Sequence, residues 1–148
     1  MENFKIDNFV RENPGCLFPD VLTLTQDEAL SLKSKLIELL RLDPTVDSLK
    51  LINFLLGKSS AITNINAEED DFNFLEVMRL AGINPKQSVL VNWDRMETID
   101  RIQFDDFCKY FSDIWYPSSD DIEIFDDSLT WMVFIEHSGD IRLAQLRT

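Results

Sequence analysis

His137 is the only histidine in the chain, so any Ser-His-Asp or Cys-His catalytic arrangement would have to use it. The sequence has no Gly-x-Ser-x-Gly turn, and its two cysteines, Cys16 and Cys108, are isolated from any such partner. His137 itself precedes a Ser-Gly-Asp sequence that is typical of a turn after a strand. These residues favour a structural histidine, and we expect no catalytic residue and no enzymatic activity.

The sequence also lacks residues suited to binding a metal ion or a cofactor. One histidine and two distant cysteines cannot supply the four closely spaced nitrogen or sulfur ligands of a structural zinc site. The acids between Ser119 and Asp127 lack the glycine and the final glutamate of a calcium-binding loop. Asp121 and Glu123 resemble the carboxylates of nucleases that pair an Asp with Glu-x-Lys, but the lysine position is Phe125. We therefore expect no metal and, with four isolated glycines, no phosphate-bound cofactor.

The acids are more informative as a surface. The chain has 27 Asp plus Glu against 14 Lys plus Arg, a formal net charge of −13. Residues 94–140 alone hold thirteen acids against three bases, a net charge of −10, whereas residues 1–66 are nearly balanced. Because a surface of this sign repels nucleic acids and anionic membranes, we expect neither as a partner and favour a basic protein.

Aromatic side chains next to such an acidic run are typical anchors of protein interfaces. Trp115 and Tyr116 lie within this run, although a Trp-Tyr-Pro segment can equally well pack onto the core. The alternative for any single carboxylate is that it lies on a solvent-exposed face or in an acidic turn and binds no partner. The sequence predicts a partner-binding surface made of Asp113, Trp115, Tyr116, Asp120, Asp121, Glu123, Asp126 and Asp127.

The elements that must position these residues change character along the chain. Thr25 to Glu28 has the spacing of a capping box and predicts a helix that runs to about Leu42. Asp43-Pro44 predicts the start of a second helix, which Gly57 ends. A third helix is expected after a cap at Asn66 and should end at Gly82.

The second half of the chain favours strands. We expect strands at 88–93, 121–125, 130–137 and 141–146, the last three as a meander, and a helix at 104–113. This pattern predicts an α+β fold in which N-terminal helices pack on one face of an antiparallel sheet of about four strands. No boundary is evident, so residues 1–148 form one expected domain, with a helical half to about residue 85 and a strand-rich acidic half from about residue 86.

The compartment can be judged from the cysteines and the apolar runs. Charges interrupt residues 1–7, which argues against a signal peptide or membrane anchor, and the longest apolar runs are only as long as strands. Two isolated cysteines are typical of reduced thiols rather than of a disulfide framework. We expect a cytoplasmic protein without a disulfide.

A resemblance sharpens the functional expectation. The segment from Trp115 to Asp126, the later Trp131 and the turn at 137–139 resemble small acidic bacterial proteins of the polymorphic-toxin and contact-dependent-inhibition immunity type. The resemblance implies a protein that binds a cognate toxin, frequently a basic nuclease, and blocks its active site or an exosite. We expect a non-enzymatic immunity protein that neutralises a basic toxin domain through its acidic surface.

Two alternatives stay open. The first is a small intracellular enzyme that uses Asp120, Asp121 or His137 at the strand ends. The second is a ligand-sensing domain with an apolar pocket between helices and sheet.

Overall fold

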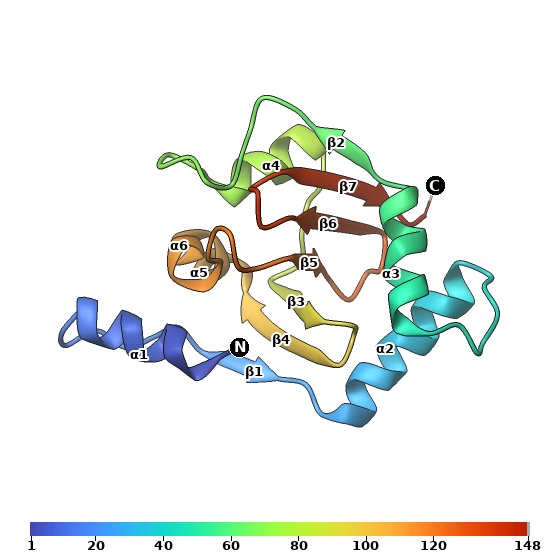
Figure 1. Cartoon of the computed structure of the whole chain (residues 1–148), viewed down its shortest axis with the longest axis horizontal. Coiled ribbons are helices and arrows are strands. Elements are labelled where there is room, and N and C mark those ends of the chain that lie inside the picture. Colours follow the sequence, from blue (N-terminus) through green and yellow to red (C-terminus); the bar gives the residue numbers. More distant parts are fainter. Residues whose placement is uncertain (148) are drawn as a thin grey trace.

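The sheet is larger than the sequence indicates. The computed structural model describes residues 1–147 and, over this range, places seven strands in one antiparallel sheet with the order β1-β4-β3-β5-β6-β7-β2 (Figure 1). The α+β class and the antiparallel sheet are confirmed, but the expected number of about four strands is wrong. The strands are β1 (Val21–Thr23), β2 (Ser60–Ile62), β3 (Ser88–Asp94), β4 (Thr98–Gln103), β5 (Ile122–Phe125), β6 (Trp131–Ile135) and β7 (Ile141–Gln145).

The three unexpected strands have weak sequence signals for physical reasons. β1 and β2 are three-residue strands at the two edges of the sheet, and neither contains a fully buried side chain. Very short edge strands are common in natural sheets, and three residues without a buried side chain show no apolar pattern. In β4 the adjacent Asp100 and Arg101 interrupt the apolar pattern, although Asp100 is completely buried.

The helices begin and end with recognisable caps. They are α1 (Asn3–Glu12), α2 (Gln26–Leu39), α3 (Ser48–Gly57), α4 (Phe74–Ala81), α5 (Phe104–Lys109) and α6 (Phe111–Ile114). The capping box before α2 is confirmed, because the Glu28 amide donates to the Thr25 hydroxyl and the Thr25 amide donates to the Glu28 carboxylate. Gly82 ends α4 in the left-handed conformation, at a φ of 66°, as expected.

Two helix starts differ from expectation. The cap of α3 is Asp47, whose carboxylate accepts from the Lys50 amide, rather than Asp43. Asp43 instead accepts from the amide and the hydroxyl of Thr45, both at its Oδ1 atom, so its side chain is already engaged in the preceding turn. In the same way α4 begins only after Asn73, because the acidic segment that follows Asn66 forms turns. α1 has no counterpart among the expected elements.

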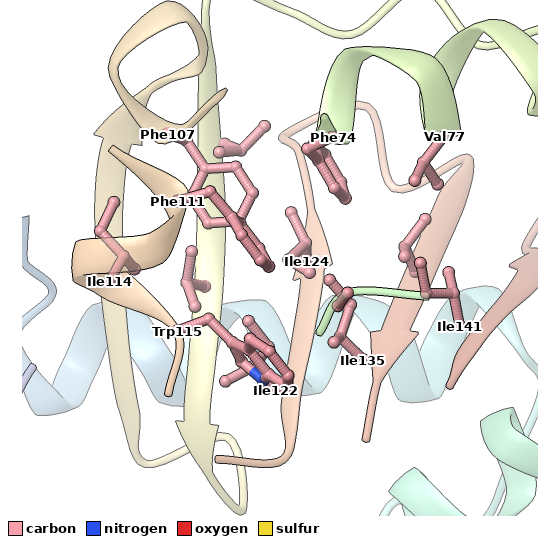
Figure 2. Close-up of a cluster of buried hydrophobic side chains, with 14 of the residues drawn as sticks. Phe74, Val77, Phe107, Phe111, Ile114, Trp115, Ile122, Ile124, Ile135 and Ile141 are labelled. Atoms are coloured by element: carbon pink, nitrogen blue, oxygen red, sulfur yellow. The ribbon is translucent and has the colours of Figure 1, made fainter. Parts of the chain in front are cut away.

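Helices cover both faces of the sheet, so the expectation of helices on one face is wrong. Side chains alternate between faces along a strand, and in β3 Val89 and Val91 join one core while Leu90 joins the other. α2 and α3 pack on the Leu90 face. α4, α5 and α6 cover the opposite face, where the side chains of Phe74, Phe107 and Trp115 meet the isoleucines of β5, β6 and β7 (Figure 2).

No helix within residues 1–147 combines the length and the apolar character needed to cross a membrane.

Candidate functional site

The expected acidic and aromatic surface does not form one patch, because two of its members, Tyr116 and Asp120, contact a lysine of α1. Lys5 is 1% exposed, and its ammonium pairs with Asp120 and donates to the Ile114 carbonyl at 2.7 Å. The same nitrogen lies 4.8 Å from the centroid of the Tyr116 ring, a cation–π distance. Asp120 also accepts from the Tyr116 amide at 2.8 Å. This arrangement fastens α1 to the chain that leads into β5.

Trp115 belongs to the core beneath this cluster. It is 2% exposed, its ring stacks on Phe111 with centroids 5.7 Å apart, and its indole donates to the Asp120 carbonyl at 2.9 Å. A side chain this buried offers a partner no contact area in this conformation. Of the two interpretations given by the sequence, the packed one describes its environment (Figure 2).

The acids after β5 are also engaged within the fold. Asp126 is 1% exposed and accepts from the Trp131 indole at 3.2 Å and from the amides of Lys86 and Ser128. Asp127 is more exposed and forms a two-pronged ion pair with Arg101, at 2.7 and 3.2 Å. Each carboxylate therefore already has donors from its own chain.

Asp113 lies apart from the other expected residues, on α6. Burial raises the pKa of its carboxyl above the ordinary value, and the negative charge of Glu12 raises it further.

Asp121 and Glu123 do come together, in an open groove of about 630 Å³ between α3 and the sheet. One wall is apolar and comes from α3, and the other carries charged side chains from the ends of β3, β5 and β6. The apolar wall includes Leu49, Ile52 and Leu56, and the charged wall includes Asp94, Arg95, Asp121, Glu123, Glu136 and His137. The strand pairing explains the position, because Asn92 of β3 lies opposite Glu123, and Phe134 of β6 lies opposite it on the other side.

Among the acids of this groove, Glu123 has the pKa that is shifted furthest from its ordinary value. Its side chain is largely buried, and burial raises the pKa of its carboxyl to about 7, with smaller contributions from the charges of Asp121 and Asp94. The Asn92 amide group donates to the carboxylate at 2.6 Å and opposes this shift. The Asn92 oxygen accepts from the Met96 amide at 3.0 Å, which fixes the orientation of the Asn92 side chain. Glu123 is thus held in place by a neutral hydrogen-bond donor.

The mouth of the groove carries exposed charged groups. His137 approaches Asp121 with its ring Nδ1 2.9 Å from the carboxylate, and its amide donates to the same oxygen at 2.7 Å. The hydrogen bond to Asp121 raises the pKa of His137 above its ordinary value. Arg95 lies 3.7 Å from Asp94, and both side chains are about two-thirds exposed. Exposed pairs of this kind remain available for exchange with an incoming charge.

The groove contains residues that the sequence did not indicate as site residues. Asn92 lies in a strand that reads as a simple buried run, and Leu49, Ile52 and Leu56 read as the buried face of α3. The available signal was a polar asparagine between the apolar residues Val91 and Trp93, since a buried amide requires hydrogen-bond partners. Nothing in the sequence indicates that the Leu49 side chain is 53% exposed to solvent.

The remaining chemistry of the described chain is limited. Within residues 1–147, no group of three or more His, Cys, Asp or Glu side chains is arranged to hold a metal ion. Cys16 and Cys108 are free thiols, and burial raises the pKa of Cys108 to about 12, which leaves it protonated and unreactive at neutral pH.

Comparisons with known proteins give no family for this arrangement. No protein-family model matches the chain, and neither the curated proteins nor the solved structures give a significant match.

Proposed function

We propose that this chain is a non-enzymatic binding protein that neutralises a basic protein partner, most concretely a toxin domain, in the manner of an immunity protein. The observation that carries the proposal is the groove, where carboxylates outnumber the nearby bases beside an exposed apolar wall. Complementary charge accelerates the encounter of two proteins, and apolar contact holds the complex. The net charge of −10 in residues 94–140 supports a basic partner and disfavours nucleic acid and anionic membranes.

The proposal includes a cytoplasmic location. Its support is the pair of free cysteines, because isolated reduced thiols are typical of a reducing compartment.

The primary test is complex formation. The tagged protein is used to capture partners from its native cells, and the product of the adjacent upstream gene is co-expressed with it. We expect a basic protein in the complex and protection from its toxicity. If that product neither binds nor becomes less toxic on co-expression, the immunity proposal is rejected.

A charge-matched pair of variants then places the contact. The groove variant combines Asp94→Asn, Asp121→Asn and Glu136→Gln, whereas the control combines Asp70→Asn, Asp71→Asn and Asp105→Asn beside α4 and α5 on the opposite face of the sheet. Each removes three negative charges. We expect the groove variant to slow association about tenfold at low salt and the control to change it much less. Equal effects would mean that only net charge matters.

An enzyme remains the second candidate because of Glu123. A carboxyl with a pKa near 7 in a groove suits general acid–base catalysis, and His137 and Asp121 lie in the same groove. Asp120 does not support it, since it pairs with Lys5. The test is turnover of ester, phosphate-ester and glycoside substrate panels by the wild type and by Glu123→Gln. Activity that the substitution abolishes would favour an enzyme, and activity unchanged by it would exclude this site.

A further inference from the structure

We propose that the groove between α3 and the sheet seats one arginine side chain of the basic partner, with the aliphatic stem against α3 and the guanidinium at the carboxylates of β5 and β6. This inference rests on the proposed function and names the chemistry by which the same site would recognise its partner. The proposed occupant of the groove is a single arginine with an apolar residue beside it.

The two walls of the groove have the two characters of such a side chain. Leu49, Ile52 and Leu56 are spaced three and four residues apart, so they share one face of α3 and form a continuous apolar strip. Opposite this strip lie carboxylates of Asp121, Glu123 and Glu136. Arginine buries an aliphatic stem along apolar surface while it keeps a charged head for acidic groups, so it complements both walls at once.

The size of the groove fits this occupant. Its volume of about 630 Å³ lies in the range of sites that enclose small molecules, and it is open rather than sealed. An ion alone would leave the α3 wall uncovered. The groove has room for one long side chain and a neighbouring residue, and the stem of that side chain would cover the α3 wall.

Charge complementarity selects a cation. The groove has four acids, Asp94, Asp121, Glu123 and Glu136, against Arg95 and His137. Arg95 lies beside Asp94 and His137 beside Asp121, both at exposed positions. Within residues 1–147 no ion pair joins Glu123 to a base, and its hydrogen-bonding side-chain partner is the neutral Asn92. A guanidinium that reached Glu123 would supply the missing counter-ion.

Arginine suits this position better than lysine. Its planar guanidinium can bond two carboxylates or both oxygens of one, and it is more weakly hydrated than an ammonium ion. Asp121 immediately precedes β5 and Glu123 lies within it, and both line the groove close enough for the Asp121 charge to act on Glu123, so their carboxylates are neighbours on one side of the sheet. A forked cation can therefore engage both.

The raised pKa of Glu123 adds a pH signature to this geometry. A cation beside the carboxyl favours its ionised form, so binding near neutral pH should release a proton and strengthen as the pH rises from 6 to 8. The charged groups around Glu123 are Asp94 at the end of β3 and Arg95 after it, Asp121 just before β5, and Glu136 and His137 after β6, while α3 contributes apolar residues. Loss of the His137 charge over the same range acts in the same direction, so both groups must be varied.

The first experiment uses a minimal probe on the whole chain. N-acetyl-leucyl-arginine amide is titrated into isotopically labelled protein at pH 7.5 and followed by amide chemical shifts, with the citrulline analogue as an uncharged control of the same shape. We expect saturable shifts at Leu49, Ile52 and Glu123, and affinity about tenfold weaker for citrulline. Equal affinities, or shifts centred on another surface, would overturn the inference.

Matched variants separate the two walls. Leu49→Ser should weaken arginine and citrulline probes alike, whereas Leu80→Ser, at a similarly exposed leucine on the opposite face, should leave both unchanged. Glu123→Gln should weaken the arginine probe about five- to tenfold, and combined with His137→Asn it should remove the pH dependence. If Glu123→Gln binds the arginine probe as tightly as the wild type, the inference is wrong.

The outcome is distinguishable from failure of the proposed function. A captured toxin whose binding is insensitive to Leu49→Ser and Glu123→Gln would keep the function and overturn this contact. A probe that binds in the groove, with no toxin neutralised, would keep the arginine site and overturn the function.

Discussion

Strand β5 is flanked by two Asp-Asp pairs, Asp120-Asp121 before it and Asp126-Asp127 after it. In each pair the first aspartate is nearly or fully inaccessible and accepts several hydrogen bonds, and the second is exposed beside one basic side chain. The first members face the core beneath α4 to α6, as the contact of Asp126 with the Trp131 indole shows. The second members lie on the side that carries α2 and α3.

The two pairs show why the number of acids in a segment overstates how many carboxylates are available to a partner. The net charge of −10 in residues 94–140 includes Asp100, Asp120 and Asp126, which are inside the fold and hydrogen-bonded there. Of the ten other acids in this segment, four line the groove: Asp94, Asp121, Glu123 and Glu136. The number of donors around each carboxylate, rather than its position in the sequence, separates the acids that build the fold from those that are available.

The largest difference is expected between Asp120 and Asp121. Asp120→Asn removes the counter-ion of buried Lys5, and an uncompensated buried charge costs about 3–5 kcal/mol of unfolding free energy. Asp121→Asn removes an exposed pair with His137 and should cost less than about 1 kcal/mol. Urea unfolding at pH 7 measures both.

A second variant isolates the cause of the Asp120 effect. Combining Asp120→Asn with Lys5→Met removes the buried charge as well, so it should recover part of the lost stability. Equal losses of unfolding free energy for Asp120→Asn and Asp121→Asn would contradict the distinction between the buried and the exposed aspartate.

The next difference concerns Asp126 and Asp127. Asp126→Asn turns an amide NH₂ group toward the donors that the carboxylate now accepts, the Trp131 indole and the Lys86 amide, and should cost about 2–4 kcal/mol. Asp127→Asn weakens a partly exposed contact with Arg101 and should cost about 1 kcal/mol or less. Thermal unfolding of the two variants checks the order, and a greater loss for Asp127→Asn would contradict it.

The fold was predictable where local physics decides it. The capping box at Thr25 and the left-handed Gly82 were correctly placed, because each is specified by neighbouring residues. β1 could not be predicted, since three residues with partly and fully exposed side chains acquire strand geometry only by pairing with β4. The second layer of helices, on the other face of the sheet, could not be predicted either, because it depends on which face the long connecting segments cross.

Glu123 provides a third test, through pH. Its pKa is raised in the folded state to about 7 from an ordinary 4.5, so between these values the folded chain binds more protons than the unfolded chain. The Glu123 contribution to stability is therefore greatest below about pH 4.5 and is lost as the pH rises through about 7, a change of about 3 kcal/mol. Unfolding free energies measured from pH 5 to 8 give this slope.

Glu123→Gln should remove that slope and be more stable than the wild type at pH 8. Glu136→Gln removes a charge from the same groove and should keep the wild-type slope. An unchanged slope in Glu123→Gln would show that the carboxyl is solvated like the exposed acids.

The candidate site was only partly predictable. Asp121 and Glu123 were among the eight expected residues, and both line the groove. Trp115 has the type and setting of an interface anchor, but its burial depends on α6 and β5, which are separate in sequence. The apolar wall could not be predicted either, because the leucines of α3 include both the fully buried Leu51 and Leu55 and the 53% exposed Leu49, and their spacing alone does not tell them apart.

The smallest expected effect is on the titration of His137. Its pKa is raised chiefly by the hydrogen bond to Asp121 and then by the Asp121 charge, with a lesser contribution from Glu136. Asp121→Asn should move the pKa of His137 down toward its ordinary value of 6.5, and Glu136→Gln should move it down by less. The imidazole proton resonances followed from pH 5 to 9 measure both shifts. If Asp121→Asn left the titration unchanged, His137 would be free of Asp121 in solution, and the exposed member of the first Asp-Asp pair would have no partner of its own to exchange for an incoming arginine.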